Sequence, residues 1–115
     1  MLPKKNRLTK KNDFDAVFRK GKSVKADFFI CKTLKNNLQE SRFGFVVSKK
    51  VSPKATARNK VKRRLQKAVF CILKEVGGSN DIVVITLPGI EKKEYLEIEK
   101  AVKDSFKKLK ICSDL

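Results

Sequence analysis

Apolar residues recur along the chain with two different periods, and the period indicates which segments form helices and which form strands. In residues 11–19, Phe14, Val17 and Phe18 follow the i, i+3, i+4 spacing of a single helix face. This spacing predicts a short helix that ends at Gly21. Phe14 and Phe18 are either core residues, which their spacing favours, or one of them edges a groove in which unpaired bases stack.

Strand-forming residues follow this first helix. The stretch "SVKADFFICKTL" and, after the polar "KNNLQES", the stretch "RFGFVVSKK" predict strands that pair as an antiparallel hairpin. Phe29, Phe43 and Phe45 are expected in the core. Further on, "DIVVITLP" is an almost continuous apolar run of strand length, which predicts a central strand covered on both faces.

Two longer helices are predicted in the second half of the chain. The first begins either with Ser52 as N-cap or with Thr56 as N-cap, of which we favour Thr56, and continues to about Val76 before Gly77-Gly78. Its sheet-facing stripe comprises Val61, Leu65, Val69, Ile72 and Val76. The second spans residues 91–111 and covers the core with Tyr95, Ile98, Val102, Phe106 and Leu109. The pattern predicts one α/β sandwich domain, residues 1–115, with helices packed on a single sheet.

Charge is concentrated in two segments of this chain. The 115 residues carry a net charge of +17, and residues 49–67 alone hold nine lysines and arginines and no acid. Residues 1–25 add nine basic residues against two acids. Such localisation is typical of proteins that bind a polyanion, since each neutralised phosphate releases condensed counterions. Nucleic acid is therefore the partner class that the sequence favours.

The basic segment coincides with the first long helix. Lys60, Arg63, Arg64 and Lys67 project from the arc opposite the apolar stripe, whereas Arg58 and Lys62 lie beside it. A solvated helix face usually interleaves acids to form i,i+4 pairs, but this helix has no acid before Glu75. We therefore favour a phosphodiester-binding face, to which Asn59 adds hydrogen-bonding groups in the first turn.

Catalysis by the protein alone finds no support in the sequence. The chain has no histidine, and no phosphate-binding glycine loop is present. Asp13 and Asp15 lie on different sides of a short helix, which suits surface charge better than acid-base catalysis. The cysteines are Cys31, Cys71 and Cys112, an odd number without metal-ligand spacing. With no signal-like or membrane-spanning run, the expected location is the cytoplasm, with no membrane partner.

Four motifs, in order and spacing, resemble the protein component of bacterial ribonuclease P. They are "NRLTKKNDFDAVFRKGKSV", "RFGFVVSKK", "KATARNKVKRRLQ" and "DIVVIT". The most specific is the motif R-N-[RK]-x-K-R-x-x-R, which begins here at Arg58. The chain departs from it at Gln66, where the family usually has arginine, and the "VSPKAT" link before the helix is one residue longer than the family tends to have.

The resemblance implies a specific division of labour. In this family an RNA subunit uses magnesium to cut the 5′ leader from precursor tRNA, and the protein binds that RNA and the leader. No cofactor is expected on the protein alone. The implied fold is an α+β two-layer sandwich of order α-β-β-β-α-β-α, with a mixed sheet of about four strands and a left-handed βαβ crossover.

The resemblance also implies three groups of site residues, with no catalytic or metal-binding residue among them. The residues expected to contact the catalytic RNA are Arg58, Asn59, Lys60, Lys62, Arg63, Arg64 and Lys67. Those expected at the leader cleft are Phe14, Phe18, Ser48, Lys49 and Lys50. Those of the basic arm are Arg7, Lys10 and Lys11.

The main alternative function is that of a structural RNA-binding protein such as a small ribosomal protein. A DNA-binding helix module is a weaker alternative, because no helix-turn-helix pattern is present.

Overall fold

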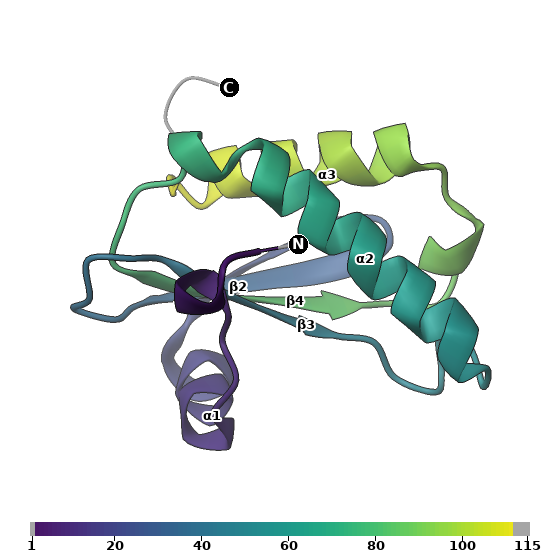
Figure 1. The fold of residues 1–115 in the computed structure, drawn as a ribbon, viewed down its shortest axis with the longest axis horizontal. Helices are drawn as coiled ribbons and strands as arrows, with labels where there is room; N and C mark the ends of the chain where they lie inside the picture. The colour runs from purple at the N-terminus through teal and green to yellow at the C-terminus, as the bar shows by residue number, and fades with distance from the viewer. Residues whose placement is uncertain (1, 112–115) are drawn as a thin grey trace.

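The centre of the molecule is a four-stranded sheet in which the last strand lies inside (Figure 1). The computed structural model describes residues 2–111, so Cys112 lies outside the described residues. The strands are β1 (Lys22–Lys25), β2 (Phe29–Lys35), β3 (Arg42–Val46) and β4 (Asn80–Thr86), in the order β1-β2-β4-β3. The sheet is mixed, as expected, since β4 runs antiparallel to β2 and parallel to β3.

The position of β4 shows that the predicted hairpin is wrong. Strands β2 and β3 are consecutive in the chain, but each pairs with β4 and not with the other. The prediction for β4 itself is confirmed, because Ile82, Val83 and Val84 are all fully buried. Both faces of the strand are covered, since Ile82 and Val84 belong to the apolar cluster on one side of the sheet and Val83 to the cluster on the other.

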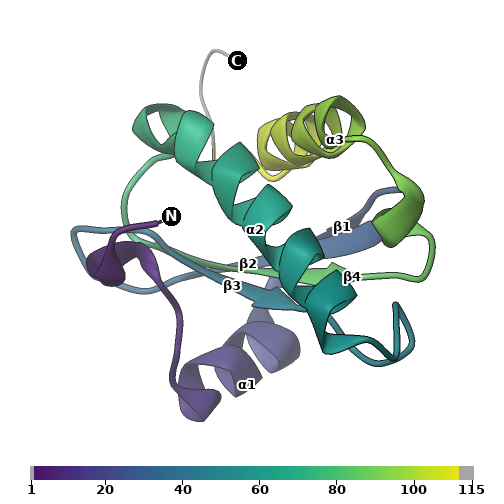
Figure 2. The same cartoon turned by 45° about the vertical axis from the view of Figure 1, so that its right-hand side comes forward.

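Helices cover the two faces of the sheet unequally. Helix α1 (Lys11–Lys20) lies on one face, and α2 (Ala55–Cys71) and α3 (Tyr95–Lys108) lie on the other (Figures 1 and 2). The larger apolar cluster, which includes Phe29, Phe43 and Phe106, fills the space under α2 and α3. In Figure 1 the connection from β3 through α2 to β4 is a left-handed crossover, as the resemblance implied.

The apolar stripe of α2 is confirmed for four of its five predicted residues, but the predicted ends of the helix are not. Val61, Leu65, Val69 and Ile72 are buried, whereas Val76 lies beyond the helix, after a 3-10 turn, and is only partly buried. The helix begins at Ala55 and its N-cap is Lys54, without a side-chain capping bond, so the Thr56 cap is wrong. It ends at Cys71, and a 3-10 turn over Leu73–Glu75 takes the chain toward Gly77-Gly78. No helix in the described part of the chain is both long and apolar enough to cross a membrane.

The last helix covers the sheet as predicted, although it is shorter than expected. A 3-10 turn over Ile90–Lys92 precedes it, and a capping box between Glu94 and Glu97 sets its first turn. Its stripe of Ile98, Val102 and Phe106 is fully buried. The ring of Phe106 stacks on that of Phe43 with centroids 6.0 Å apart, which ties α3 to the sheet.

Candidate nucleic-acid interface

Helix α2 presents a basic face to solvent from Arg58 to Lys67. Its 17 residues contain no acid, and the apolar stripe holds the opposite side against the sheet. Among the residues predicted to contact RNA, Asn59, Lys60, Lys62, Arg63 and Lys67 are exposed. Because no carboxylate on the helix neutralises these cations, their field extends into solvent and attracts a polyanion.

The predicted RNA-binding residues do not all lie on one flank of α2. On the flank toward the N-terminal segment, Lys62 and Gln66 line a cavity of about 180 Å³ together with Arg7. On the other flank, Arg64 Nη1 donates a hydrogen bond of 3.0 Å to the Lys93 carbonyl before α3. The flank toward the N-terminal segment therefore keeps its cations available for a ligand, whereas Arg64 is committed to the fold.

Lys67 is also drawn toward α3. Its ammonium lies 4.7 Å from the ring centroid of Tyr95, a cation-π contact. Burial is the main cause that raises the pKa of Tyr95 above its usual value, and so this phenol stays neutral at physiological pH. Lys67 is exposed and lies at the margin of the basic face.

Arg58 holds the turn that leads into α2. Its Nη1 donates hydrogen bonds to the carbonyl oxygens of Ser52, at 3.0 Å, and Pro53, at 2.9 Å. These bonds satisfy carbonyl groups in the irregular segment before the helix, where no side-chain cap is present. Arg58 therefore shapes the start of the basic helix, and its side chain remains half-exposed there.

Gln66 occupies the position where the motif usually has arginine. Its Oε1 atom is buried and has no hydrogen-bond partner within the protein. Since the same cavity is lined by Lys62 and Arg7, the uncompensated acceptor lies beside two cationic side chains. The substitution removes one positive charge from this cavity and puts an amide in its place.

The predicted basic arm is anchored along the edge strand β3. Arg7 forms a bridge with Phe43, and the Leu8 amide donates a 2.8 Å hydrogen bond to the Phe43 carbonyl. Arg7 Nε also donates to the Leu2 carbonyl at 2.8 Å. Lys10 and Lys11 follow as the N-cap and first residue of α1, and both are exposed. The arm thus connects the basic flank of α2 with the start of α1.

The two phenylalanines of α1 have different environments. Phe14 is half-buried and packs on Gly44, where even a methyl group would overlap its ring. Phe18 is 37% exposed, and its ring centroid is 6.3 Å from that of Phe14. Phe14 therefore supports the helix against the sheet, and Phe18 is the ring that a ligand on this face can reach.

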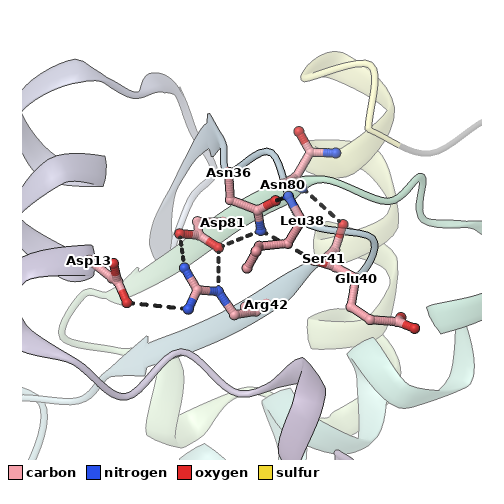
Figure 3. Close-up of polar contacts among 8 residues, drawn as sticks. All are labelled: Asp13, Asn36, Leu38, Glu40, Ser41, Arg42, Asn80 and Asp81. Atoms are coloured by element: carbon pink, nitrogen blue, oxygen red, sulfur yellow. Dashed lines mark hydrogen bonds and ion pairs between the residues drawn. The ribbon is translucent and has the colours of Figure 1, made fainter.

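A buried ion network fixes α1 to the sheet (Figure 3). Arg42 on β3 forms a bidentate pair with Asp81 on β4, with N–O distances of 2.8 and 2.7 Å. The same guanidinium reaches Asp13 on α1 at 3.2 Å. Asn36 donates a further hydrogen bond of 2.7 Å to Asp81. The hydrogen bonding that Arg42 donates to Asp81 is the main cause that raises the pKa of Arg42, so the guanidinium stays charged.

Ser48, Lys49 and Lys50 form an exposed turn at the carboxyl end of β3. The Val51 amide closes this turn on the Ser48 carbonyl at 3.1 Å. The turn lies along the chain between β3, on whose Gly44 Phe14 packs, and α2, which begins at Ala55.

The sequence interpretation missed three residues of this interface. Arg42 and Gly44 lie in the quoted motif "RFGFVVSKK", but their roles depend on contacts with α1 that no local pattern reveals. Phe70 is an exposed aromatic residue on the basic helix, and a helical wheel would have placed it opposite the apolar stripe. Within the described residues, no group of three or more His, Cys, Asp or Glu side chains could hold a metal ion.

Comparison with known proteins gives a consistent result across the chain. The family model described as Ribonuclease P matches residues 2–110. The chain is 36% identical over 108 residues to the ribonuclease P protein component of Alkaliphilus metalliredigens, covering 94% of this chain and 96% of that protein. It is 38% identical over 110 residues to that of Legionella pneumophila, strain Corby, covering 95% and 93%.

Solved structures show the same fold. The structure of the Staphylococcus aureus RNase P protein superposes with a TM-score of 0.86 at 28% identity, covering 94% of this chain and 98% of that chain. The RNase P protein from Thermotoga maritima superposes with a TM-score of 0.81 at 29% identity, covering 89% and 96%. The residues matched by the family model include the sheet, all three helices and the basic motif.

Proposed function

The chain belongs to the ribonuclease P protein family, and we propose that it binds the RNA subunit of that enzyme and the 5′ leader of precursor tRNA. In this assignment it is the non-catalytic subunit of an endoribonuclease that produces the mature 5′ end of tRNA. The observation that carries the proposal is the acid-free basic face of α2 in a chain whose family is that of ribonuclease P.

The RNA subunit is assigned to the flank of α2 that faces the N-terminal segment. Asn59, Lys62 and Arg63 are exposed there, and Arg7 lines the same cavity as Lys62. Phosphate contacts from these cations release counterions, so they supply affinity with a steep salt dependence. Lys60 and Lys67 extend the same field on the far flank, while Arg58 and Arg64 hold the helix in place as well as adding charge.

The leader is assigned to the opposite face of the sheet, beside α1. The exposed ring of Phe18 offers a stacking surface for an unpaired base. Phe14 packs on Gly44 and so holds α1 against the sheet. Lys10 and Lys11 at the start of α1 are free to contact the leader phosphates. Ser48, Lys49 and Lys50 extend this surface at the carboxyl end of β3.

Cleavage itself is assigned to the RNA subunit, which would hold the catalytic magnesium ions. The protein has no histidine, and the carboxylates of Asp13 and Asp81 are engaged with Arg42. The protein would supply binding energy and positive charge. The charge would lower the magnesium concentration that the RNA subunit needs to fold and to bind precursor tRNA. Its working place would be the cytoplasm, where precursor tRNA is processed.

The test is cleavage of a precursor tRNA with a 5′ leader by bacterial RNase P RNA at low magnesium, with and without the protein. Using the RNAs of Alkaliphilus metalliredigens and Bacillus cereus, we expect cleavage at the mature 5′ end only when both components are present. Mature tRNA, which lacks the leader, serves as the binding control, and the protein should raise its affinity for the RNA subunit less than that of the precursor. Tight RNA binding without stimulated cleavage by either RNA would instead indicate a structural RNA-binding protein.

A further inference from the structure

One aromatic residue on the basic helix lies outside both apolar clusters of the core. The chain contains eight phenylalanines, all within the described residues, and only Phe18 and Phe70 are exposed, at 37% and 50%. Phe70 lies near the end of α2, four residues after Gln66 and seven after Arg63, so these side chains share one side of the helix. The ring is thus presented to solvent along the line of the basic face.

The surroundings of Phe70 are suited to nucleic acid. Helix α2 has no acid, and the chain continues after it with Lys74 before the first carboxylate at Glu75. An exposed ring among cations matches the combination that single-stranded RNA requires, namely phosphates that need positive charge and bases that need a flat apolar surface. We propose that the ring of Phe70 stacks on an unpaired base of the RNA bound by α2.

The fold indicates which RNA supplies that base. Phe70 lies on α2, whereas Phe18 lies on α1, and the sheet separates the two helices (Figures 1 and 2). A leader that passes beside α1 does not reach the outer side of α2. The base therefore belongs to the RNase P RNA, and this inference rests on the proposed function.

Stacking and phosphate contacts have different dependences on salt. A cation that neutralises one phosphate changes the slope of log K against log salt by nearly one, because a counterion is released. A stacked base releases no counterion, so removal of the ring should lower affinity equally at every salt concentration. This difference separates Phe70 from the neighbouring lysines and arginines in a single experiment.

The experiment measures the affinity of the RNase P RNA of Alkaliphilus metalliredigens for wild-type protein and four variants over a range of KCl concentrations. Phe70→Ala and Phe70→Leu should bind about 5- to 100-fold more weakly with an unchanged salt slope. Phe70→Leu keeps an apolar side chain with good helix propensity and removes only the ring. Phe70→Trp, which keeps a stacking surface, should bind at least as tightly as wild type.

The matched control is Leu96→Ala on α3. Leu96 is also an exposed apolar residue, at 72%, but it lies beside the acidic residues Glu94 and Glu97. Its removal should leave affinity unchanged. Unchanged affinity in Phe70→Leu, a similar loss in Leu96→Ala, or an altered salt slope in Phe70→Ala would each overturn the stacking role. Wild-type protein that fails to bind would overturn the proposed function as well, so the two failures are distinguishable.

Discussion

Replacement of Arg42 by methionine tests how the buried carboxylate of Asp81 is stabilised. The Asp81 side chain is 7% exposed, and Arg42 supplies two of the hydrogen bonds that its carboxylate accepts. Removal of one partner from a buried ion pair typically costs about 3–5 kcal/mol, because the other charge remains buried without compensation. Arg42 is itself 22% exposed, and Asn36 keeps its bond to Asp81, so both effects reduce the cost.

From these contacts we expect Arg42→Met to lower the free energy of unfolding by about 2.5 kcal/mol. For 115 residues this loss corresponds to a decrease in Tm of roughly 10 °C. Asp13→Asn should cost only about 0.5–1 kcal/mol, since its 3.2 Å contact is single and more exposed. Asp81→Asn added to Arg42→Met should recover part of the loss, because it removes the buried uncompensated charge.

The assay is urea unfolding at pH 7 followed by circular dichroism, with linear extrapolation to water. Lys5→Met is the control, since Lys5 and Glu40 form an ion pair whose side chains are 65% and 47% exposed. That variant should lie within about 0.5 kcal/mol of wild type. A loss below about 1 kcal/mol in Arg42→Met, or no recovery in the double variant, would refute the account of Asp81 as a charge held by Arg42.

Three further outcomes are expected. Lys62→Ala should weaken binding to RNase P RNA and reduce the salt slope by about one, and an unchanged slope would contradict a phosphate contact. Phe18→Ala should lower affinity for a precursor tRNA with a leader but leave the melting temperature unchanged, whereas a large loss of stability would assign Phe18 to the core. Burial raises the pKa of Cys31 to about 12, so in a Cys112→Ser background Ellman's reagent at pH 8 should label exposed Cys71 alone. Rapid labelling of two thiols in the native state would argue against that burial.

Helix periodicity predicted the existence of α1, α2 and α3, because each buries one stripe that repeats every three or four residues. The helix ends were harder to predict. Ser52 and Thr56 both have side chains suited to an N-cap, but α2 begins after Lys54 without such a bond. The start is set instead by the turn that Arg58 holds through the Ser52 and Pro53 carbonyls. Backbone contacts made by Arg58 therefore stand in for the side-chain cap that the local sequence favoured.

The strand pairing was wrong for a reason that local sequence does not reveal. Consecutive strands separated by a short polar loop usually pair, and β2 and β3 meet that description. However, β4 lies between them, where both of its edges are paired and its apolar residues are buried on both faces of the sheet. Whether β2 pairs with β3 or with β4 is therefore decided by a segment that begins more than thirty residues after β3.

The sequence predicted the basic face of α2, but it did not predict how the two flanks of that helix differ. A helical wheel separates Lys62 from Arg64 without indicating which flank meets α3. The structure decides this through the bond from Arg64 to the Lys93 carbonyl. The roles of Phe14 and Phe18 also stayed open at the sequence level. They depend on Gly44, whose missing side chain leaves room for the Phe14 ring against the sheet.

The inner position of β4 also has a consequence for the protein during its synthesis. Strands β2 and β3 leave the ribosome long before β4; β2 can pair with β1 at once, but its other edge and β3 must wait for β4, because β2 and β3 do not pair with each other. Until Thr86 has emerged, the nascent chain exposes two unpaired strand edges and the uncovered stripe of α2. The sheet closes only after about three quarters of the chain has been made, and until then repulsion between the basic segments of neighbouring chains opposes the association of these edges.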